Sequence, residues 1–103
     1  MKRLFAVVRT HAPAWDEKRP LEEQPGWPAH AEFMNALAAE GFAIVGGPLE
    51  GSADALLVFR AHNEDEVRTR LKADPWGDDM LKLTRIDPWQ LRLGENKFAS
   101  GTE

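Results

Sequence analysis

The chain has 103 residues, a formal net charge of −4 and no cysteine. This length suits one domain, residues 1–103, that can bury a core without covalent cross-links. The absence of cysteine excludes disulfides and thiolate chemistry, and the negative charge disfavours nucleic-acid binding, which depends on neutralising phosphates. The apolar run near the N-terminus ends at Arg9, too early for a signal peptide or a membrane span, so we expect a cytoplasmic protein without a membrane partner.

Apolar periodicity predicts six regular elements. They are strands at residues 4–8, 42–45, 55–59 and 81–86, the last continuing at 89–93 past a bulge or an edge at Asp87-Pro88, and helices at 28–40 and from Asn63 to about Ala73. Residues 46–52 are expected to form the turn of a hairpin between the second and third strands.

Residues 10–26 are predicted to be a long loop, because three prolines and Gly26 are interspersed there with charged residues. Loops of this length in compact domains are functional lids or solvated segments. In the second case Trp15 would simply pack onto the body of the domain. Residues 94–103 are expected to be a flexible tail.

The order strand, helix, strand, strand, helix, strand predicts an α+β, ferredoxin-like βαββαβ fold, with an antiparallel sheet and two helices on one face. The first and third strands are apolar on both faces, although two helices can cover only one of them. We therefore expect a homodimer packed sheet against sheet, which would bury the second face.

A histidine shares the apolar stripe of the first helix. His30 lies three residues before Phe33 and four before Met34. Asp74 follows the second helix, because Pro75 forces it out of helical geometry. A carboxylate that orients an imidazole makes a general base, which predicts a catalytic pair of His30 and Asp74. The alternative is a buried histidine that is merely satisfied by a helix-terminal carboxylate.

Other candidate groups are weaker. Arg9, at the end of the first strand, could bind a substrate carboxylate through two hydrogen bonds, or be an ordinary surface arginine. The three histidines lack metal-ligand spacing, so no metal site is expected. The glycines of residues 46–51 lack the strand–loop–helix context and the lysine of a phosphate-binding loop. No cofactor motif is visible.

At the level of motifs and their order, the chain resembles the YCII-related (YciI-like) domain family over roughly residues 3–93. The matching features are Arg9, His30 within His-Ala-Glu-Phe-Met-Asn-Ala-Leu, Gly41, Gly47-Pro48, Gly51, Asp74-Pro75-Trp76 and Pro88-Trp89. The loop at residues 11–27 is longer than in short bacterial members, and Trp76 stands where phenylalanine is common.

The resemblance implies a dimeric α+β barrel with a histidine–aspartate active site, which maps onto His30 and Asp74. We further predict that Arg9 and Trp76 contact substrate. A related dehydrochlorinase of chlorinated hydroxyquinone breakdown implies that the scaffold can support acid–base elimination.

Three functions compete at this stage. The first is a cofactor-independent enzyme of the lyase or hydrolase kind, catalysing elimination, isomerisation or hydrolysis of a small molecule. The second is a non-catalytic homodimer that binds a small ligand between sheet and helices. The third is a partner-binding module with Trp15 and Trp27 as exposed anchors.

Overall fold

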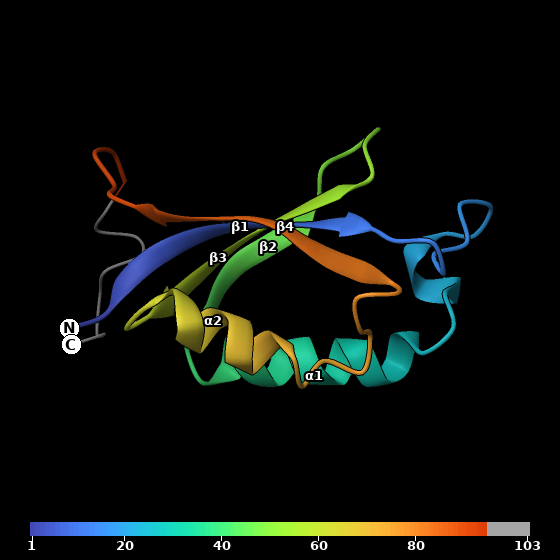
Figure 1. Ribbon diagram of the computed structural model, residues 1–103, viewed down its shortest axis with the longest axis horizontal. Coiled ribbons are helices and arrows are strands. Elements are labelled where there is room, and N and C mark those ends of the chain that lie inside the picture. Colours follow the sequence, from blue (N-terminus) through green and yellow to red (C-terminus); the bar gives the residue numbers. More distant parts are fainter. Residues whose placement is uncertain (95–103) are drawn as a thin grey trace.

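The computed structural model describes residues 1–94 and shows one four-stranded sheet with both helices packed against the same face (Figure 1). The elements are β1 (Arg3–His11), a short 3-10 helix η1 (Leu21–Glu23), α1 (Trp27–Ala39), β2 (Ala43–Pro48), β3 (Asp54–Ala61), α2 (Glu64–Leu71) and β4 (Leu81–Trp89). The strand order is β2-β3-β1-β4 and the pairings are antiparallel. The α+β, ferredoxin-like fold is therefore confirmed.

The two strands with apolar residues on both faces occupy the centre of the sheet. β3 pairs with β1 on one side and forms the expected hairpin with β2 on the other. β4 is an edge strand, which accommodates Pro88 because an edge strand has a neighbouring strand on one side only. Of the two alternatives predicted at Pro88, a bulge or an edge, the structure shows the edge, and the register shift between β1 and β4 lies between Val8 and Arg9.

One end of each helix follows from local sequence. Gly41, with φ of +82°, ends α1 in a Schellman motif, in which the Phe42 amide donates to Leu37 and the Gly41 amide donates to Ala38. At the start of α2, the Asn63 side chain accepts a hydrogen bond from the Glu66 amide. These caps fix where each helix begins or ends relative to the sheet.

The interior divides into two clusters. The main one lies between the sheet and the helices and contains Phe5, Val7, Leu37, Phe42, Phe59, Ala61, Val67 and Leu71. A second cluster of Trp76, Met80 and Leu81 is extended by Trp15, Leu21 and Trp27. The second cluster joins the loop after β1 to the segment between α2 and β4, and it forms the support of the site described below.

Several predicted boundaries were wrong. β1 continues through Thr10 and His11, so the long loop begins at residue 12 instead of 10, and η1 interrupts it. β2 extends through Gly46 to Pro48, which was predicted to be turn, because an edge strand tolerates glycine and proline. α2 ends at Leu71, two residues before the predicted Ala73. β4 ends at Trp89, so residues 90–93 add no further strand. Apart from Gly94, the predicted tail lies outside the described residues.

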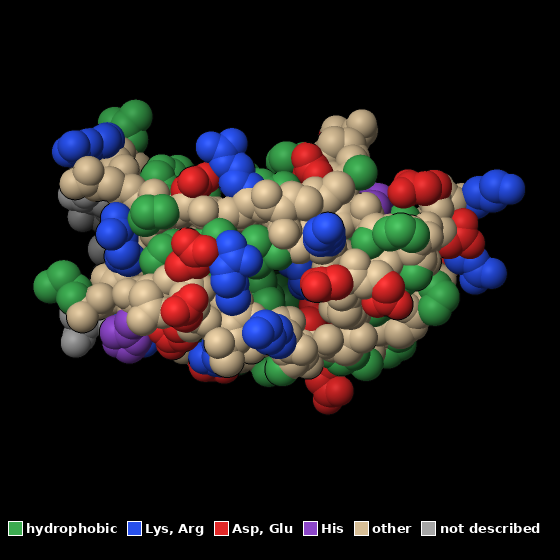
Figure 2. All heavy atoms as spheres, in the orientation of Figure 1, with side chains coloured by type: hydrophobic (Ala, Val, Ile, Leu, Met, Phe, Trp, Pro, Cys, Tyr) green, Lys and Arg blue, Asp and Glu red, His purple; other side chains and the backbone are tan. Residues whose placement is uncertain are grey.

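Charges of both signs are interspersed on the face drawn in Figure 2, where the described residues form no broad region of one sign. Within residues 1–94, no helix has the length and apolar character needed to cross a membrane.

Candidate functional site

The centre of the site is the carboxylate of Asp74, whose side chain is completely buried. Arg9 Nη1 donates to Oδ2 at 2.6 Å, and the Trp76 amide donates to Oδ1 at 2.9 Å. The latter is the side-chain-to-backbone bond of an Asx turn, which the Asp-Pro sequence favours. Three donors, with His30 as the third, thus converge on one carboxylate.

His30 is oriented by that carboxylate. Its Nδ1 lies 2.9 Å from both Asp74 oxygens, so Nδ1 carries the hydrogen, since an ionised carboxylate only accepts. In the neutral ring Nε2 then holds the free lone pair. Within residues 1–94, Nε2 has no hydrogen-bond partner. Every buried side-chain nitrogen or oxygen of these residues does have a partner. Nε2 is therefore not buried and is accessible.

Arg9 lies on the helix-facing side of β1 and is buried, so it is not the ordinary surface arginine that the sequence allowed as an alternative. It follows Phe5 and Val7 in the buried alternation, directly after the register shift, and its guanidinium lies beside Asp74. Nη2 donates to the carbonyls of Trp76 and Leu81 at 3.2 and 3.3 Å. The guanidinium thus ties β1 to the segment before β4. Its assignment as a substrate-binding residue stays a prediction.

The charge state of Asp74 is set by two opposing effects. Burial raises the pKa of Asp74, whereas hydrogen bonds from His30, Arg9 and the Trp76 amide lower it, and the net pKa lies below its usual value. The carboxylate therefore remains ionised at neutral pH. An ionised Asp74 accepts the Nδ1 hydrogen of His30, which holds the ring in one tautomer.

Trp76 forms the wall behind the imidazole. Its ring stacks on that of His30 with centroids 4.0 Å apart and an interplanar angle of 14°. The indole N–H donates to the Pro25 carbonyl at 2.7 Å, which connects the stack to the residue before Gly26. Trp27, at the start of α1, lies 5.9 Å from both rings. The plane of His30 is thus fixed by packing as well as by Asp74.

Gly26 is required where α1 approaches Trp76. It has φ of +82°, and a Cβ there would lie 3.0 Å from Trp76 Nε1. Gly41 shares φ of +82° but has nothing within 4 Å of its Cβ position. We expect Gly41→Ala to cost about 1–2 kcal/mol from backbone strain alone, and Gly26→Ala to cost more and to weaken the His30–Trp76 stack. Urea unfolding and tryptophan fluorescence would check this, and equal losses for the two variants would contradict it.

The loop between β1 and α1 is held in place by Gln24, which is 2% exposed. Its amide nitrogen donates to the carbonyls of Asp16 and Arg19, and its amide oxygen accepts from the Asp16 amide. Trp15 contacts Trp76 edge-on at 5.3 Å. Packing of Trp15 on the body of the domain was one of the two alternatives for this loop.

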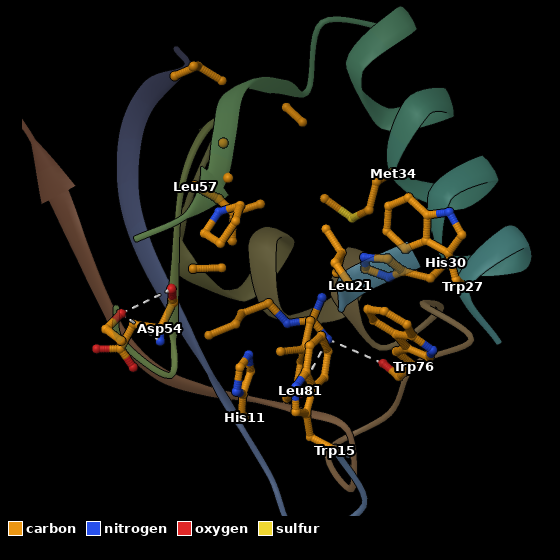
Figure 3. A pocket seen from close by; sticks show the side chains of 18 of the residues that line it. His11, Trp15, Leu21, Trp27, His30, Met34, Asp54, Leu57, Trp76 and Leu81 are labelled. Atoms are coloured by element: carbon orange, nitrogen blue, oxygen red, sulfur yellow. Dashed lines mark hydrogen bonds between the residues drawn. The ribbon is translucent and has the colours of Figure 1, made fainter. Parts of the chain in front are cut away.

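A cavity of about 640 Å³ lies between the sheet, α1 and this loop. Figure 3 shows Trp15, Trp27, His30 and Trp76 around it, with Met34 on α1. Asp74 lies behind His30, outside the lining. The two tryptophans predicted as anchors on an open patch therefore line a hollow instead. The cavity combines these aromatic walls with six ionisable side chains, which are Arg9, His11, Glu17, Arg19, His30 and Asp54.

Sequence reasoning missed some residues at this cavity. His11 and Glu17 line it, and His11 Nδ1 lies 3.2 Å from Glu17 Oε2. A histidine six residues before a glutamate has no helical or strand spacing that would have indicated the pair. Gln24 likewise gave no signal. Among the described residues, no cluster of three or more His, Asp or Glu side chains could hold a metal ion.

The fold and site define a ferredoxin-like α+β protein with a carboxylate-oriented histidine at a cavity. No protein-family model matches the chain, and no curated protein matches it. Among solved structures, it is similar to 5-chloro-2-hydroxyhydroquinone dehydrochlorinase from Burkholderia phenoliruptrix AC1100, in complex with 2,5-dihydroxybenzoquinone. The match covers 84% of this chain and 93% of that chain, with 24% identity and a TM-score of 0.61. This likeness supports the fold expected of a YciI-like protein, whereas membership of that family stays a prediction.

Proposed function

We propose that this protein is a small-molecule enzyme in which His30 acts as a general base through Nε2. The observation that carries the proposal is the orientation of the ring: Asp74 holds Nδ1, while the accessible Nε2 belongs to a residue that lines the cavity. General bases held in this way accelerate proton transfer by about 10²–10⁴-fold.

The proposed chemistry is elimination, isomerisation or hydrolysis without a cofactor. His30 Nε2 takes a proton from the substrate and becomes an imidazolium. The adjacent Asp74 carboxylate stabilises this charge. Arg9 keeps Asp74 ionised and in place through the 2.6 Å contact. We assign Arg9 this positioning role beside the predicted contact with substrate, which would use the part of the guanidinium at the cavity.

The proposed substrate is a small hydroxylated aromatic molecule. A cavity of about 640 Å³ falls within the range of small-molecule sites, roughly 300–1,000 Å³. Its aromatic side chains offer flat faces to a planar ring. The name of the similar dehydrochlorinase and the quinone in its complex identify compounds of the same kind to test.

The test uses 5-chloro-2-hydroxyhydroquinone, with chloride release measured by ion chromatography. We expect turnover that is saturable in substrate and inhibited by 2,5-dihydroxybenzoquinone. The alternative function is a non-catalytic, homodimeric ligand-binding domain. It predicts that 2,5-dihydroxybenzoquinone raises the melting temperature while no chloride is released. An absence of both turnover and binding would contradict this substrate class.

We also propose that the protein is a homodimer through the sheet face opposite the helices. Figure 1 shows α1 and α2 on one side of the sheet, with no helix of the described residues on the other. Val8 on β1 is paired with Leu56 on β3. Both lie on that face, because Phe5 and Val7 alternate onto the helix-facing side of the sheet. Leu56 is 37% exposed and Val45, on β2, is 52% exposed. An apolar face of this kind on a small domain indicates a protein partner.

The dimer predicts a specific effect of charge on this face. We expect Leu56→Lys to shift sedimentation equilibrium from twice the chain mass of 11.6 kDa toward the monomer, because a lysine pair would be desolvated in the interface. Ala36→Lys, on an exposed position of α1, is the matched control and should leave the dimer intact. A wild-type monomer at micromolar concentration would contradict the proposal.

A further inference from the structure

The cavity contains a second imidazole that the proposed chemistry does not yet use. His11, the last residue of β1, lines the same cavity as His30 and its side chain is 20% exposed. Alternation along the strand places His11 on the same face as Arg9. Two residues of an extended strand span about 7 Å. His11 therefore lies one strand repeat beyond the arginine that holds Asp74.

The local arrangement of His11 repeats that of His30. The His11 ring stacks on Trp15 with centroids 4.0 Å apart and an angle of 10°, just as His30 stacks on Trp76 at 4.0 Å and 14°. Its Nδ1 contacts a carboxylate, that of Glu17, at 3.2 Å. In both rings, a tryptophan fixes the plane and a carboxylate holds Nδ1, which leaves Nε2 for another partner.

The two sites differ in their access to solvent. The Asp74 side chain is fully buried, whereas the Glu17 side chain is 69% exposed. His11 can therefore exchange protons with water through its exposed edge, while His30 is 10% exposed. In Figure 3 His30 comes from α1 and His11 from the strand on another side of the cavity. Two imidazoles from different elements thus line one cavity, and the contacting rings of Trp15 and Trp76 connect them.

We propose that His11 is a second proton-transfer residue, which acts as general acid while His30 acts as base. This rests on the proposed function of His30. For a hydroxylated aromatic ring, His30 Nε2 takes the hydroxyl proton and the O–H electron pair forms a C=O bond. The displaced ring π pair forms a C–H bond with the Nε2 proton of the doubly protonated His11 ring, which becomes neutral and keeps its Nδ1–H on Glu17. The step is an enol-to-keto isomerisation with no net redox change. Where the protonated ring carbon carries chlorine, loss of a second hydroxyl proton and of chloride then forms a quinone and HCl, and solvent restores both imidazoles.

The sequence offers a matched control. His62 contacts Glu66 at 3.1 Å through Nδ1, as His11 contacts Glu17, but it does not line the cavity. Phenylalanine can keep the stacking surface of a histidine while removing proton transfer. His11→Phe and His62→Phe therefore separate the chemical role of His11 from its packing against Trp15.

The first measurement is binding, which requires no turnover. The chain has three histidines, so single His→Phe variants assign the imidazole signals in an NMR titration with 2,5-dihydroxybenzoquinone. We expect the signals of His11 and His30 to shift and that of His62 to stay. A shift of His30 alone would overturn the role of His11 and leave the proposed function standing. If neither signal shifts, both proposals are overturned.

The second measurement is the pH profile of chloride release from 5-chloro-2-hydroxyhydroquinone. We expect His11→Phe to lower kcat about 100-fold with little change in KM, and to remove the alkaline limb, where a general acid loses its proton. Glu17 contacts His11 directly, and the other charged or titratable side chains that line the cavity are Arg9, Arg19, His30 and Asp54. An unchanged kcat, or a loss equal to that of His62→Phe, would overturn the proposal, as would no release by wild type.

Discussion

We expect His30→Asn to lower kcat for proton transfer by about 10²–10⁴-fold while the protein stays folded. The asparagine amide can replace the Nδ1–H as a donor to Asp74, but it has no group that accepts a proton in place of Nε2. Asp74 also keeps its contacts with Arg9 and the Trp76 amide. The variant therefore removes the base and leaves the buried charges compensated.

The test of this prediction compares the effect of His30→Asn on kcat with its effect on the free energy of unfolding. His30 could be a core histidine that is simply satisfied by Asp74, since both side chains are largely buried. That role predicts a lower free energy of unfolding for His30→Asn with kcat unchanged. Chloride release and urea unfolding of the same preparation distinguish the two, and loss of the acid limb of the pH profile would identify the missing group as a base.

Chain order and apolar patterning were enough to predict the fold. The strands predicted to be apolar on both faces, β1 and β3, lie at the centre of the sheet, and Pro88, where a bulge or an edge was predicted, lies in the edge strand β4. The ends of elements were harder, because Thr10 and His11 are polar and Gly46 to Pro48 have turn composition. Tertiary pairing with β3 and β4 keeps these residues extended in spite of their weak local preference.

The candidate site was only partly visible in the sequence. His30 and Asp74 could be proposed as a pair from their positions at the start of one helix and after the other, and from a resemblance, and the structure brings them to 2.9 Å. The contact between Arg9 and Asp74 spans 65 residues and depends on a register shift that no local pattern indicates. The stacks of His11 on Trp15 and of His30 on Trp76 likewise depend on how the loop packs. These features arise from tertiary structure, and spacing along the chain does not encode them.

The largest expected effect on stability comes from Asp74→Ala. The Arg9 side chain is 4% exposed, so its guanidinium would be left buried without a counterion, and the His30 Nδ1 and the Trp76 amide would lose their acceptor. Breaking a buried pair in this way costs about 3–5 kcal/mol, against a typical total of roughly 5–15 kcal/mol. The exposed pair Arg85–Asp87 provides the control, and we expect Asp87→Ala to change the free energy of unfolding by less than about 1 kcal/mol.

A second variant shows whether the loss arises from the orphaned charge. When Arg9→Met is combined with Asp74→Leu, no buried guanidinium remains, so the double variant should unfold at a higher urea concentration than Asp74→Ala alone. If the double variant is the less stable of the two, the cost lies in lost hydrogen bonds to the segment at Trp76 and Leu81 and not in the unpaired charge.

The pH dependence of the loss tests the same contact through its charge. The pKa of Asp74 is lowered on folding, because the hydrogen bonds of His30, Arg9 and the Trp76 amide outweigh the effect of burial. A group with a lowered folded pKa stabilises the protein above its unfolded pKa, here near 3.8, and this contribution is lost as the pH falls toward the folded value. The difference in free energy of unfolding between wild type and Asp74→Asn should therefore be constant above about pH 5 and shrink on further acidification. A difference that stays the same down to pH values well below 3.8 would mean that Asp74 contributes by shape alone. In that case the carboxylate could not be the group that stabilises an imidazolium at His30.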